Sequence, residues 1–561
     1  MSKRTFSAAA RMTCIAVLAG MVAFSMGAGA QGKGVTQKDL LDAQDRTDTW
    51  IHYGRNYGAW RHVPLDKINK SNVNRLVPKW VFQTGISGGG FETSAISYEG
   101  KLYITTANSH LFCVDARTGV LIWRYDHALP PSVNLCCGPV NRGVAILGNR
   151  IYYTTLDARL LCLDADTGLV LWDRMVADYR ESYSLTLAPL IVKDKVIIGI
   201  SGGEYGIRGF IDAYDVDSGE QSWRFYTIPG EGEPGNETWG GDSWKTGGAP
   251  AWVTGTYDPE LDLIYWGIGN PGPDWNGAIR PGDNLYSNSI VALNPDTGKL
   301  VWHFQSTPHD IFDWDATSEP IIVDEEIDGR MVKAVIQVNR NGYTYALDRT
   351  NGDFIYARPY TEVTWADLEK PGKPILRELL ARPGGMKYVS PGLFGGKNWP
   401  PAAYSPDTHY VYIPDMVRPT TFLTLDVVYR RGLPFYGGVP IFGPVEGAKG
   451  YIRAVDVRTG EVKWTFETPG GPNWAGLLST SAGIVFGGAP DGYLRAFDAE
   501  TGEILWKYQT GSGTFAPPTS FELDGKQYIG LAAGWGQPAE AVGISATAGG
   551  SAYFVFGLMD E

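Results

Sequence analysis

Short apolar runs separated by turn residues recur along the whole chain and predict strands. Lys101-Leu-Tyr-Ile-Thr105 is one such run, and Leu111-Phe-Cys-Val114 is the next. The turn Asp115-Ala-Arg-Thr-Gly119 follows, and Trp123-Arg-Tyr125 begins another run. Brief alternating runs broken by Asp, Thr and Gly are typical of antiparallel strands, and no helical period replaces them. The pattern therefore predicts an all-β protein.

One phrase repeats within this pattern: an acidic residue, then Thr-Gly or Ser-Gly, then a tryptophan four residues after the glycine. Its copies begin at Asp115, Asp164, Asp215, Asp456 and Asp498, and two looser copies begin at Asn294 and Asp348. The glycine suits a turn with positive φ, and the acidic residue is expected to hydrogen-bond its own turn. A large ring at one fixed place can pack between neighbouring units. We therefore assign these residues a structural role.

Each repeat unit opens with a predicted hairpin, and eight such hairpins can be counted. They are centred near Ile96–Ile104, Val144–Tyr153, Leu187–Ile198, Trp252–Trp266, Ile321–Gln337, Ala402–Ile413, Leu477–Phe486 and Phe515–Leu531. Four strands per unit are typical of a β-propeller blade, so we predict an eight-bladed β-propeller with tryptophan-docking repeats; a solenoid is the alternative. The runs Lys79–Phe82 and Ser551–Phe556 would pair and close the ring. The interval from Asp348 to Asp456 has room for two units.

The first thirty residues have the pattern of an export signal. Lys3, Arg4 and Arg11 precede or flank a short apolar stretch, and Ala28-Gly29-Ala30 has the form of a cleavage site. We expect cleavage near Ala30 and a periplasmic protein, with a retained membrane anchor as the alternative. Residues 31–561 are expected to form a single propeller domain.

Net charge argues against nucleic acid as a partner. Removing residues 1–30 takes away three positive charges and no negative one, which moves the formal net charge from −13 to −16. Phosphates require a basic surface. An acidic surface suits a basic electron carrier such as a soluble cytochrome c, although solubility alone also explains it. A homodimer is among the assemblies that the sequence leaves open.

Four cysteines remain after the signal, and none lies in a Cys-x-x-Cys motif. Cys113 and Cys162 occupy matching repeat positions among apolar residues and are expected to be small buried side chains. Cys136 and Cys137 are adjacent. An oxidising compartment would allow a disulfide between them, and two packed thiols are the alternative.

Candidate chemistry follows from the register of the hairpins. The start of the first strand and the end of the second lie at the same end of a hairpin, so these positions should gather on one face around the axis. The starts are Glu92, Cys136 and Cys137 with Arg142, Gly247 and Gly248 with Trp252, Asp313 with Asp315, Lys397 to Trp399, and Trp474; the ends are Thr155, Ser201 to Glu204, Asn270 and Arg340. Carboxylate and amide oxygens suit a hard cation, and arginines with hydroxyls and aromatic rings suit a planar anion.

These positions carry motifs that resemble those of the pyrroloquinoline quinone (PQQ)-dependent alcohol dehydrogenases, the quinoprotein family that includes methanol and ethanol dehydrogenases. The motifs are Cys136-Cys-Gly-Pro-Val-Asn-Arg142-Gly, Ser201-Gly-Gly-Glu204-Tyr-Gly, Gly267-Ile-Gly-Asn270-Pro-Gly-Pro, Thr307-Pro-His-Asp-Ile-Phe-Asp313, Asn339-Arg340-Asn-Gly and Gly395-Gly-Lys-Asn398-Trp. Each is weak alone; six in this order over the mature chain are specific. No haem-attachment motif accompanies them.

The resemblance implies a role for each residue. Glu204, Asn270 and Asp313 match metal ligands, and Asp313 also matches the general base. Cys136 and Cys137 match a disulfide on one face of the quinone, Trp252 matches the indole on the other face, and Arg340 matches the cation beside the reactive oxygens. The further cofactor contacts would be Glu92, Arg142, Thr155, Ser201, Gly202, Gly203, Asn398 and Trp474. A primary or secondary alcohol would pass hydride to PQQ while the metal acts as a Lewis acid.

The metal itself stays open between calcium and a lanthanide. In the family, an acidic residue at the place of Asp315 is associated with lanthanide-dependent members, although related glucose dehydrogenases carry a similar Asp-x-Asp pair. Three carboxylates, on Glu204, Asp313 and Asp315, would suit a trivalent ion. A solvated or hydrogen-bonded carboxylate is the plain alternative for Asp315.

Two other functions remain as alternatives. A non-catalytic propeller could scaffold cell-envelope proteins, but such proteins would not be expected to keep the cysteine pair together with Glu204, Asn270 and Asp313. An aldose dehydrogenase would use the same cofactor, but the adjacent cysteines favour the alcohol branch. Pro538 falls where methanol dehydrogenases have a tryptophan, so the pocket is not expected to be specific for methanol.

Overall fold

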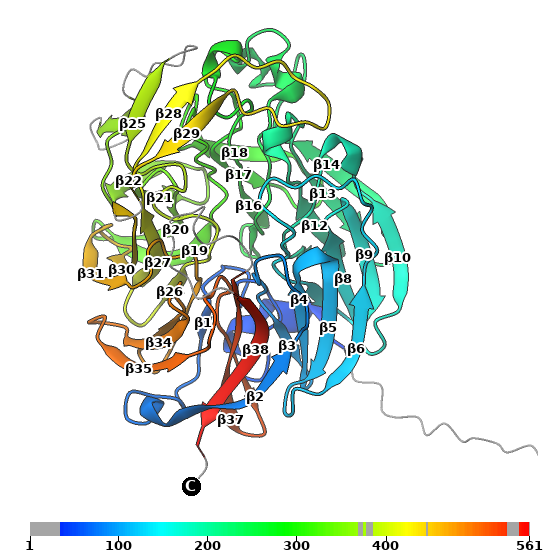
Figure 1. The fold of residues 1–561 in the computed structure, drawn as a ribbon, viewed down its shortest axis with the longest axis vertical. Coiled ribbons are helices and arrows are strands. Elements are labelled where there is room, and N and C mark those ends of the chain that lie inside the picture. The colour runs from blue at the N-terminus through cyan, green and yellow to red at the C-terminus, as the bar shows by residue number, and fades with distance from the viewer. Residues whose placement is uncertain (1–33, 369–373, 377–384, 445–446, 536–548, 560–561) are drawn as a thin grey trace, which may run out of the picture.

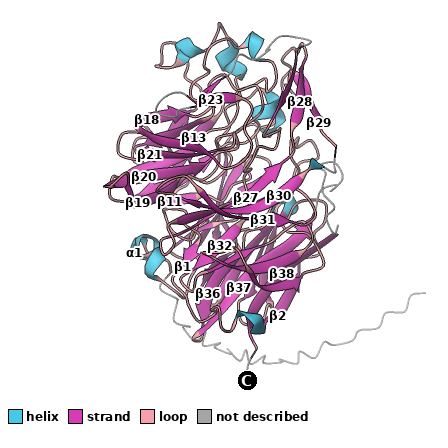
Figure 2. Ribbon diagram, turned by 90° about the vertical axis from the view of Figure 1, so that its left-hand side faces the viewer, coloured by secondary structure: helices cyan, strands magenta, loops and turns pink. Residues whose placement is uncertain are grey.

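The computed structural model describes residues 34–368, 374–376, 385–444, 447–535 and 549–559. The predicted signal and Pro538 lie outside these residues. Almost all regular structure is strand, and the helices are single short turns (Figure 2). The all-β prediction is confirmed.

Eight antiparallel sheets of the described residues surround a common centre (Figure 1). Seven of them follow the chain in order, each running from an inner to an outer strand. The first three blades are β3 (Ile96–Tyr98), β4 (Lys101–Thr106), β5 (His110–Asp115) and β6 (Leu121–Asp126); β7 (Ala145–Leu147), β8 (Arg150–Thr155), β9 (Arg159–Asp164) and β10 (Val170–Met175); and β11 (Leu190–Val192), β12 (Lys195–Gly199), β13 (Phe210–Asp215) and β14 (Gln221–Tyr226). The fourth and fifth blades are β15 (Thr256–Asp258), β16 (Leu263–Gly267), β17 (Ser289–Leu293) and β18 (Leu300–Gln305); and β19 (Ile321–Ile327), β20 (Arg330–Val338), β21 (Tyr343–Asp348) and β22 (Phe354–Pro359). The sixth and seventh blades are β26 (Ala403–Ser405), β27 (Tyr410–Val417), β30 (Lys449–Asp456) and β31 (Val462–Thr468); and β32 (Leu477–Thr480), β33 (Ile484–Gly487), β34 (Tyr493–Asp498) and β35 (Ile504–Gln509).

The eighth blade joins the two ends of the chain, as predicted. It contains β36 (Thr519–Leu523), β37 (Lys526–Trp535), β38 (Gly549–Leu558) and, as its outer strand, β2 (Leu76–Gln83). Strand β2 pairs antiparallel with β38, with Val81 opposite Phe554. Because the first and last strands share one sheet, the ring is closed and its edges are hidden.

The long interval between Asp348 and Asp456 holds one blade rather than two. Its extra length forms a hairpin of β23 (Ala366–Leu368) and β24 (Pro374–Leu376) and a three-stranded sheet of β25 (Met386–Val389), β28 (Thr420–Thr424) and β29 (Gly438–Phe442). This sheet lies at one edge of the ring (Figure 1). The inserted residues therefore decorate the propeller and do not widen it.

The repeated tryptophan of one blade packs on the repeated glycine of the next. A Cβ atom built on Gly168 would lie 2.6 Å from Cε3 of Trp123, which shows how closely the indole approaches. The indole N–H of Trp123 also donates to the carbonyl of Ala165, at 3.0 Å. The same ring-on-glycine contact joins Trp80 to Gly119, Trp172 to Gly219, Trp223 to Gly298, Trp302 to Gly352, Tyr356 to Gly460 and Trp464 to Gly502. The predicted structural role of these aromatic residues is confirmed.

A segment near the N-terminus, residues 34–63, binds the inner part of the blades. It contains helix α1 (Gln37–Leu41) and strand β1 (His62–Val63), and β1 pairs in parallel with β32. Main-chain hydrogen bonds join its residues to Ser97, Gly148, Tyr257, Ile322, Tyr404, Ser479 and Glu522, which lie in seven different blades. The side chain of Gln37 reaches Lys193 in the remaining blade. We call residues 34–63 the hub segment.

Replacing Gly168 with alanine should destabilise the protein beyond the cost of its positive φ. Gly168 and Gly148 both have positive φ, but a Cβ atom meets Trp123 only at Gly168 and meets nothing within 4 Å at Gly148. Both substitutions should lower the free energy of unfolding relative to the wild type. Because of overpacking, the decrease should be about 1–3 kcal/mol larger for Gly168→Ala than for Gly148→Ala. Calorimetry of the two variants checks this difference, and equal thermal midpoints would contradict it.

Candidate active site

A cavity of about 440 Å³ is lined by residues from all eight blades. The lining segments precede the inner strands or follow the second strands, at the end of the hairpins that the repeat register indicated. The structure brings the following predicted site residues to this cavity: Glu92, Cys136, Cys137, Arg142, Ser201, Gly202, Glu204, Trp252, Asp313, Asp315, Arg340, Asn398 and Trp474.

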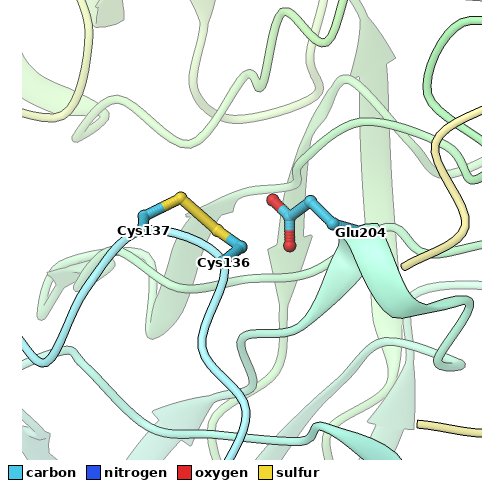
Figure 3. A group of neighbouring side chains, drawn as sticks. All are labelled: Cys136, Cys137 and Glu204. Carbon is cyan, nitrogen blue, oxygen red and sulfur yellow. A yellow bond between two sulfur atoms is a disulfide. The ribbon is translucent and has the colours of Figure 1, made fainter. Parts of the chain in front are cut away.

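Cys136 and Cys137 form a disulfide, so the alternative of two packed thiols is wrong. The disulfide lies in the cavity wall opposite the carboxylate of Glu204 (Figure 3). The sulfur atoms and a Glu204 oxygen lie within 4.8 Å of one another. Oxidised sulfur lacks the thiolate charge that binds metals, so this group is a cavity wall with an adjacent carboxylate rather than a thiolate metal site. Cys113 and Cys162 are buried, as expected.

Arg142 is held between two indole rings and a carboxylate. Its guanidinium carbon lies 4.8 Å from the centre of the Trp252 ring and 4.6 Å from that of Trp399. One of its nitrogens lies 2.9 Å from a Glu92 oxygen, and another donates to the Thr186 hydroxyl at 2.8 Å. Burial raises the pKa of Glu92 to about 7, although the charge of Arg142 opposes this shift. These contacts hold a cation rigidly at the cavity edge.

Acidic side chains gather around Arg340 in the same cavity. Asp315 forms an ion pair with Nη1 of Arg340, and Asp313 lies 3.6 Å from Nη2. Asp313 has a φ of 62°, a backbone conformation that non-glycine residues adopt at a cost and that often marks a functional site. Burial and the nearby carboxylates raise the pKa of Asp313 well above its usual value, and burial raises that of Glu204 to about 7.

Two oxygens beside this cluster suit a hard cation. Oδ1 of Asn270 and Oδ1 of Asp313 are buried, and neither accepts a hydrogen bond from the residues that the structure describes. Asn270 is fully buried, and its backbone N–H donates to Oδ1 of Asp315 at 3.0 Å. Buried oxygens without donors are rare in folded proteins. Oxygen atoms of this kind suit hard cations such as calcium or a lanthanide ion.

The structure places three predicted residues outside the cavity lining. Thr155 ends β8 and donates its hydroxyl proton to Asp157 at 2.6 Å, so it faces its own blade. Asn270 lies beside the acidic cluster. Gly203 begins the short helix of residues 203–205, where a Cβ atom would lie 2.8 Å from Pro250 and 3.5 Å from Oδ1 of Asn270. The absence of a side chain at Gly203 therefore makes room for the Pro250 ring.

Several lining residues were missed from the sequence. Thr186 is one of them: its hydroxyl accepts a hydrogen bond from Arg142 and lies 3.2 Å from that of Ser201. Thr186 precedes an inner strand, as Glu92 does in its own blade, so the repeat register contained this signal. Ser184, Phe394, Phe515 and Leu135 also line the cavity. The buried carboxylate of Asp274, next to Asn270, was missed as well.

Aromatic rings form the remaining wall. Phe394 packs edge-on against Trp474 at 5.3 Å, and Trp474 meets Phe515 at 6.3 Å between ring centres. Phe515 in turn stacks on Trp535 at 4.0 Å. Within the expanded connection Asp415–Lys449, Phe435 contacts the acidic cluster, because its N–H donates to the carbonyl of Glu204 at 2.7 Å. The cavity thus combines a buried polar cluster with an apolar side that excludes water.

Comparison with known proteins gives consistent results. The family model described as PQQ, glucose/ethanol/alcohol dehydrogenase, beta-propeller domain, matches residues 50–374 and 467–529. Quinoprotein alcohol dehydrogenase PedH of Pseudomonas putida is 41% identical over 538 residues, which are 91% of this chain and 90% of that protein. The quinoprotein ethanol dehydrogenase of Pseudomonas aeruginosa is 36% identical, with 92% and 91% covered. A europium-containing methanol dehydrogenase superposes with a TM-score of 0.88 at 33% identity, over 93% of this chain and all of the other.

Glu92 should make the cofactor-free protein less stable as pH rises from about 4.5 to about 7. Its usual pKa of 4.5 is raised to about 7 in the fold, so the unfolded chain releases this proton first. Relative to Glu92→Gln, the wild type should lose up to about 1.4 kcal/mol of unfolding free energy per pH unit between these values. Denaturant unfolding of both proteins at pH 5 and 7.5 measures this; a difference that stays constant with pH would refute the assignment.

Proposed function

This chain belongs to the family of PQQ-dependent alcohol dehydrogenases, and we propose which of its residues bind the cofactor, hold the metal and remove the substrate proton. The protein is a quinoprotein oxidoreductase that acts on alcohols, and the scaffold and aldose dehydrogenase alternatives are not favoured. The single observation that carries the residue assignment is the convergence of Glu204, Asp313 and Arg340 on one cavity beside the disulfide.

The cofactor site lies between the disulfide and Trp252. Both line the cavity, and the indole offers a flat face on which a planar ring system can stack. Arg142, paired with Glu92, and the hydroxyls of Thr186 and Ser201 supply polar contacts for the carboxylates and carbonyls of such a ring. Asn398 and Trp474 complete the in-plane contacts. Thr155 and Gly203 are not part of this proposal, because they do not line the cavity.

The metal site comprises Glu204, Asn270 and Asp313, with Asp315 beside them. When bound, PQQ and the metal ion supply the oxidant and the Lewis acid of the reaction. The cation would offset the repulsion among the carboxylates and so lower the raised pKa of Asp313. Asp313 then accepts the hydroxyl proton of the alcohol, and Arg340 holds that carboxylate in place. The aromatic wall excludes water and favours alcohols with an apolar substituent.

Asp315 differs from the other ligands. Oδ2 pairs with Arg340 and Oδ1 accepts the N–H of Asn270, so both oxygens have partners within the protein. This agrees with the alternative of a hydrogen-bonded carboxylate. Its charge still lies beside the cluster, and the similarity to a europium-containing methanol dehydrogenase supports a lanthanide as one of the two ions. We propose that Asp315 favours a trivalent ion through its charge.

Cell location and partners extend the proposal. No helix within the described ranges is long and apolar enough to cross a membrane. The disulfide and the N-terminal pattern support export to the periplasm with cleavage near Ala30. The net charge of −16 after cleavage supports a basic soluble cytochrome c as electron acceptor. Exposed apolar residues on the adjacent outer strands β6 and β10, such as Leu121 and Leu171, support a homodimer.

Replacing the base should abolish turnover and spare the cofactor. In protein reconstituted with PQQ and either Ca²⁺ or La³⁺, Asp313→Asn should lower kcat by about 10²–10⁴-fold, because the carboxylate no longer takes the proton. Dye reduction with a panel of alcohols measures turnover, and absorbance measures bound PQQ. Asp328→Asn, in an exposed turn, is the control. Failure of the wild type to bind PQQ with either ion would overturn the proposed function.

Asp315→Ala should change the ion preference. Loss of one negative charge weakens the binding of a trivalent ion more than that of a divalent ion. The activity supported by La³⁺ should therefore fall at least about 10-fold, and the ratio of Ca²⁺-supported to La³⁺-supported activity should rise. Titration of the metal-free protein with each ion, followed by dye reduction, gives the two activation constants. Full La³⁺-dependent activity in this variant would show that Asp315 has only its structural hydrogen bonds.

A further inference from the structure

The loop after Asn270 contains a buried carboxylate without an assigned role. Asp274 is 1% exposed, although its side chain is ionisable. Oδ1 accepts a hydrogen bond from Nδ2 of Asn270 at 3.0 Å. Oδ2 is buried and accepts none from the described residues. Burying a carboxylate is costly unless it is paired and hydrogen-bonded, so a buried carboxylate with one unpartnered oxygen requires an explanation.

The main chain of this loop is held without the Asp274 side chain. The N–H of Trp275 donates to the carbonyl of Tyr436 at 2.9 Å. Arg280 donates to the carbonyl of Pro273 at 3.1 Å and to that of Asp274 at 3.4 Å. A carboxylate that anchored the loop would use both oxygens on main-chain donors. Asp274 accepts a hydrogen bond with only one oxygen, and the donor is the side chain of Asn270.

The contact determines which way the Asn270 amide faces. The two ends of a side-chain amide are almost equal in shape, so packing alone does not distinguish the oxygen from the nitrogen. Oδ1 of Asp274 accepts the hydrogen bond, and an acceptor requires Nδ2 of the amide on its side. Oδ1 of the amide must then face the opposite way, which is the side of Gly203, whose Cβ position would lie 3.5 Å from that oxygen. The helical turn at Gly203 carries Glu204.

We propose that Asp274 is a positioning residue of the metal site, which holds the Asn270 amide so that Oδ1 is presented to the ion. This inference rests on the proposed role of Asn270 as a metal ligand. A neighbour that orients a ligand in this way typically contributes about 10–100-fold in metal affinity. Asp274 does not touch the substrate or the reacting atoms, so its effect appears first in metal binding.

The experiment uses Eu³⁺ as the probe in full-length protein loaded with PQQ. Asp274→Ala should bind Eu³⁺ about 10–100-fold more weakly than the wild type. Its Eu³⁺ luminescence should decay faster in H₂O than that of the wild type, and the difference should vanish in D₂O, because water replaces the misdirected amide oxygen. Asp274→Asn offers a carbonyl oxygen to Nδ2 of Asn270 and should restore most of the affinity and the wild-type decay.

Two further variants separate positioning from folding. Asp274→Leu removes the hydrogen-bond acceptor but fills the volume of the side chain. It should bind Eu³⁺ as weakly as Asp274→Ala does, so the test does not depend on whether the alanine variant folds well. Asp283→Ala alters an exposed carboxylate of the same loop and should bind Eu³⁺ as the wild type does. The thermal midpoint without metal should be similar in all variants that retain the fold.

The outcomes distinguish the inference from its premise. Wild-type Eu³⁺ affinity and decay in both Asp274→Ala and Asp274→Leu would overturn the positioning role and leave the metal site intact. Equal weakening in Asp274→Asn and Asp274→Ala would show that the charge matters and the orientation does not, which also overturns it. A wild type that binds no Eu³⁺ and no Ca²⁺ would instead refute the proposed metal site.

Discussion

The packing of an indole ring on a bare glycine of the next blade is the contact on which the rest of the molecule depends. A side chain at Gly119, Gly168 or Gly219 would occupy the space of the ring, so the contact sets a close and constant spacing between blades. Constant spacing aligns the inner strands around one axis. The loops that carry Glu92, Asp313 and Trp474 then meet at one end of that axis, although they are far apart in sequence.

The active-site cluster uses the rigidity of this ring. The carboxylates of Glu204, Asp313 and Asp315 repel one another, and burial strengthens the repulsion. A flexible assembly of these loops would separate the carboxylates and solvate them. Here Arg340 binds two of them, and the closed propeller resists separation of the blades that carry them. The cluster is therefore prepared for a cation before the cation arrives, which reduces the reorganisation that binding requires.

The sequence predicted the repeating parts of this protein better than its irregular parts. The hairpins, the ring closure by β2 and β38 and the role of Trp123 follow from local patterns of apolar and turn residues. Thr155 was predicted to contact the cofactor, but its hydroxyl donates to Asp157 and it does not line the cavity, whereas Thr186 of the next blade does. Which hydroxyl reaches Arg142 depends on how neighbouring blades align, and no local pattern shows this. Asp274 has no repeat equivalent. Its importance depends on which end of the Asn270 amide it faces, and no sequence pattern encodes that.

The hub segment has a consequence for how the chain reaches its native state. Its residues are made first, yet the partner of Thr47 is Glu522 in the last blade, and Ser479 pairs beside Arg61 and His62. Contacts between such distant residues form only after the intervening chain has lost most of its freedom. The N-terminal portion must therefore stay without its final partners while seven or eight blades take shape. Premature collapse of Trp50 and Ile51 on a partial ring would trap an incomplete propeller, so folding of this enzyme is expected to be slow and to end, rather than begin, with the start of its chain.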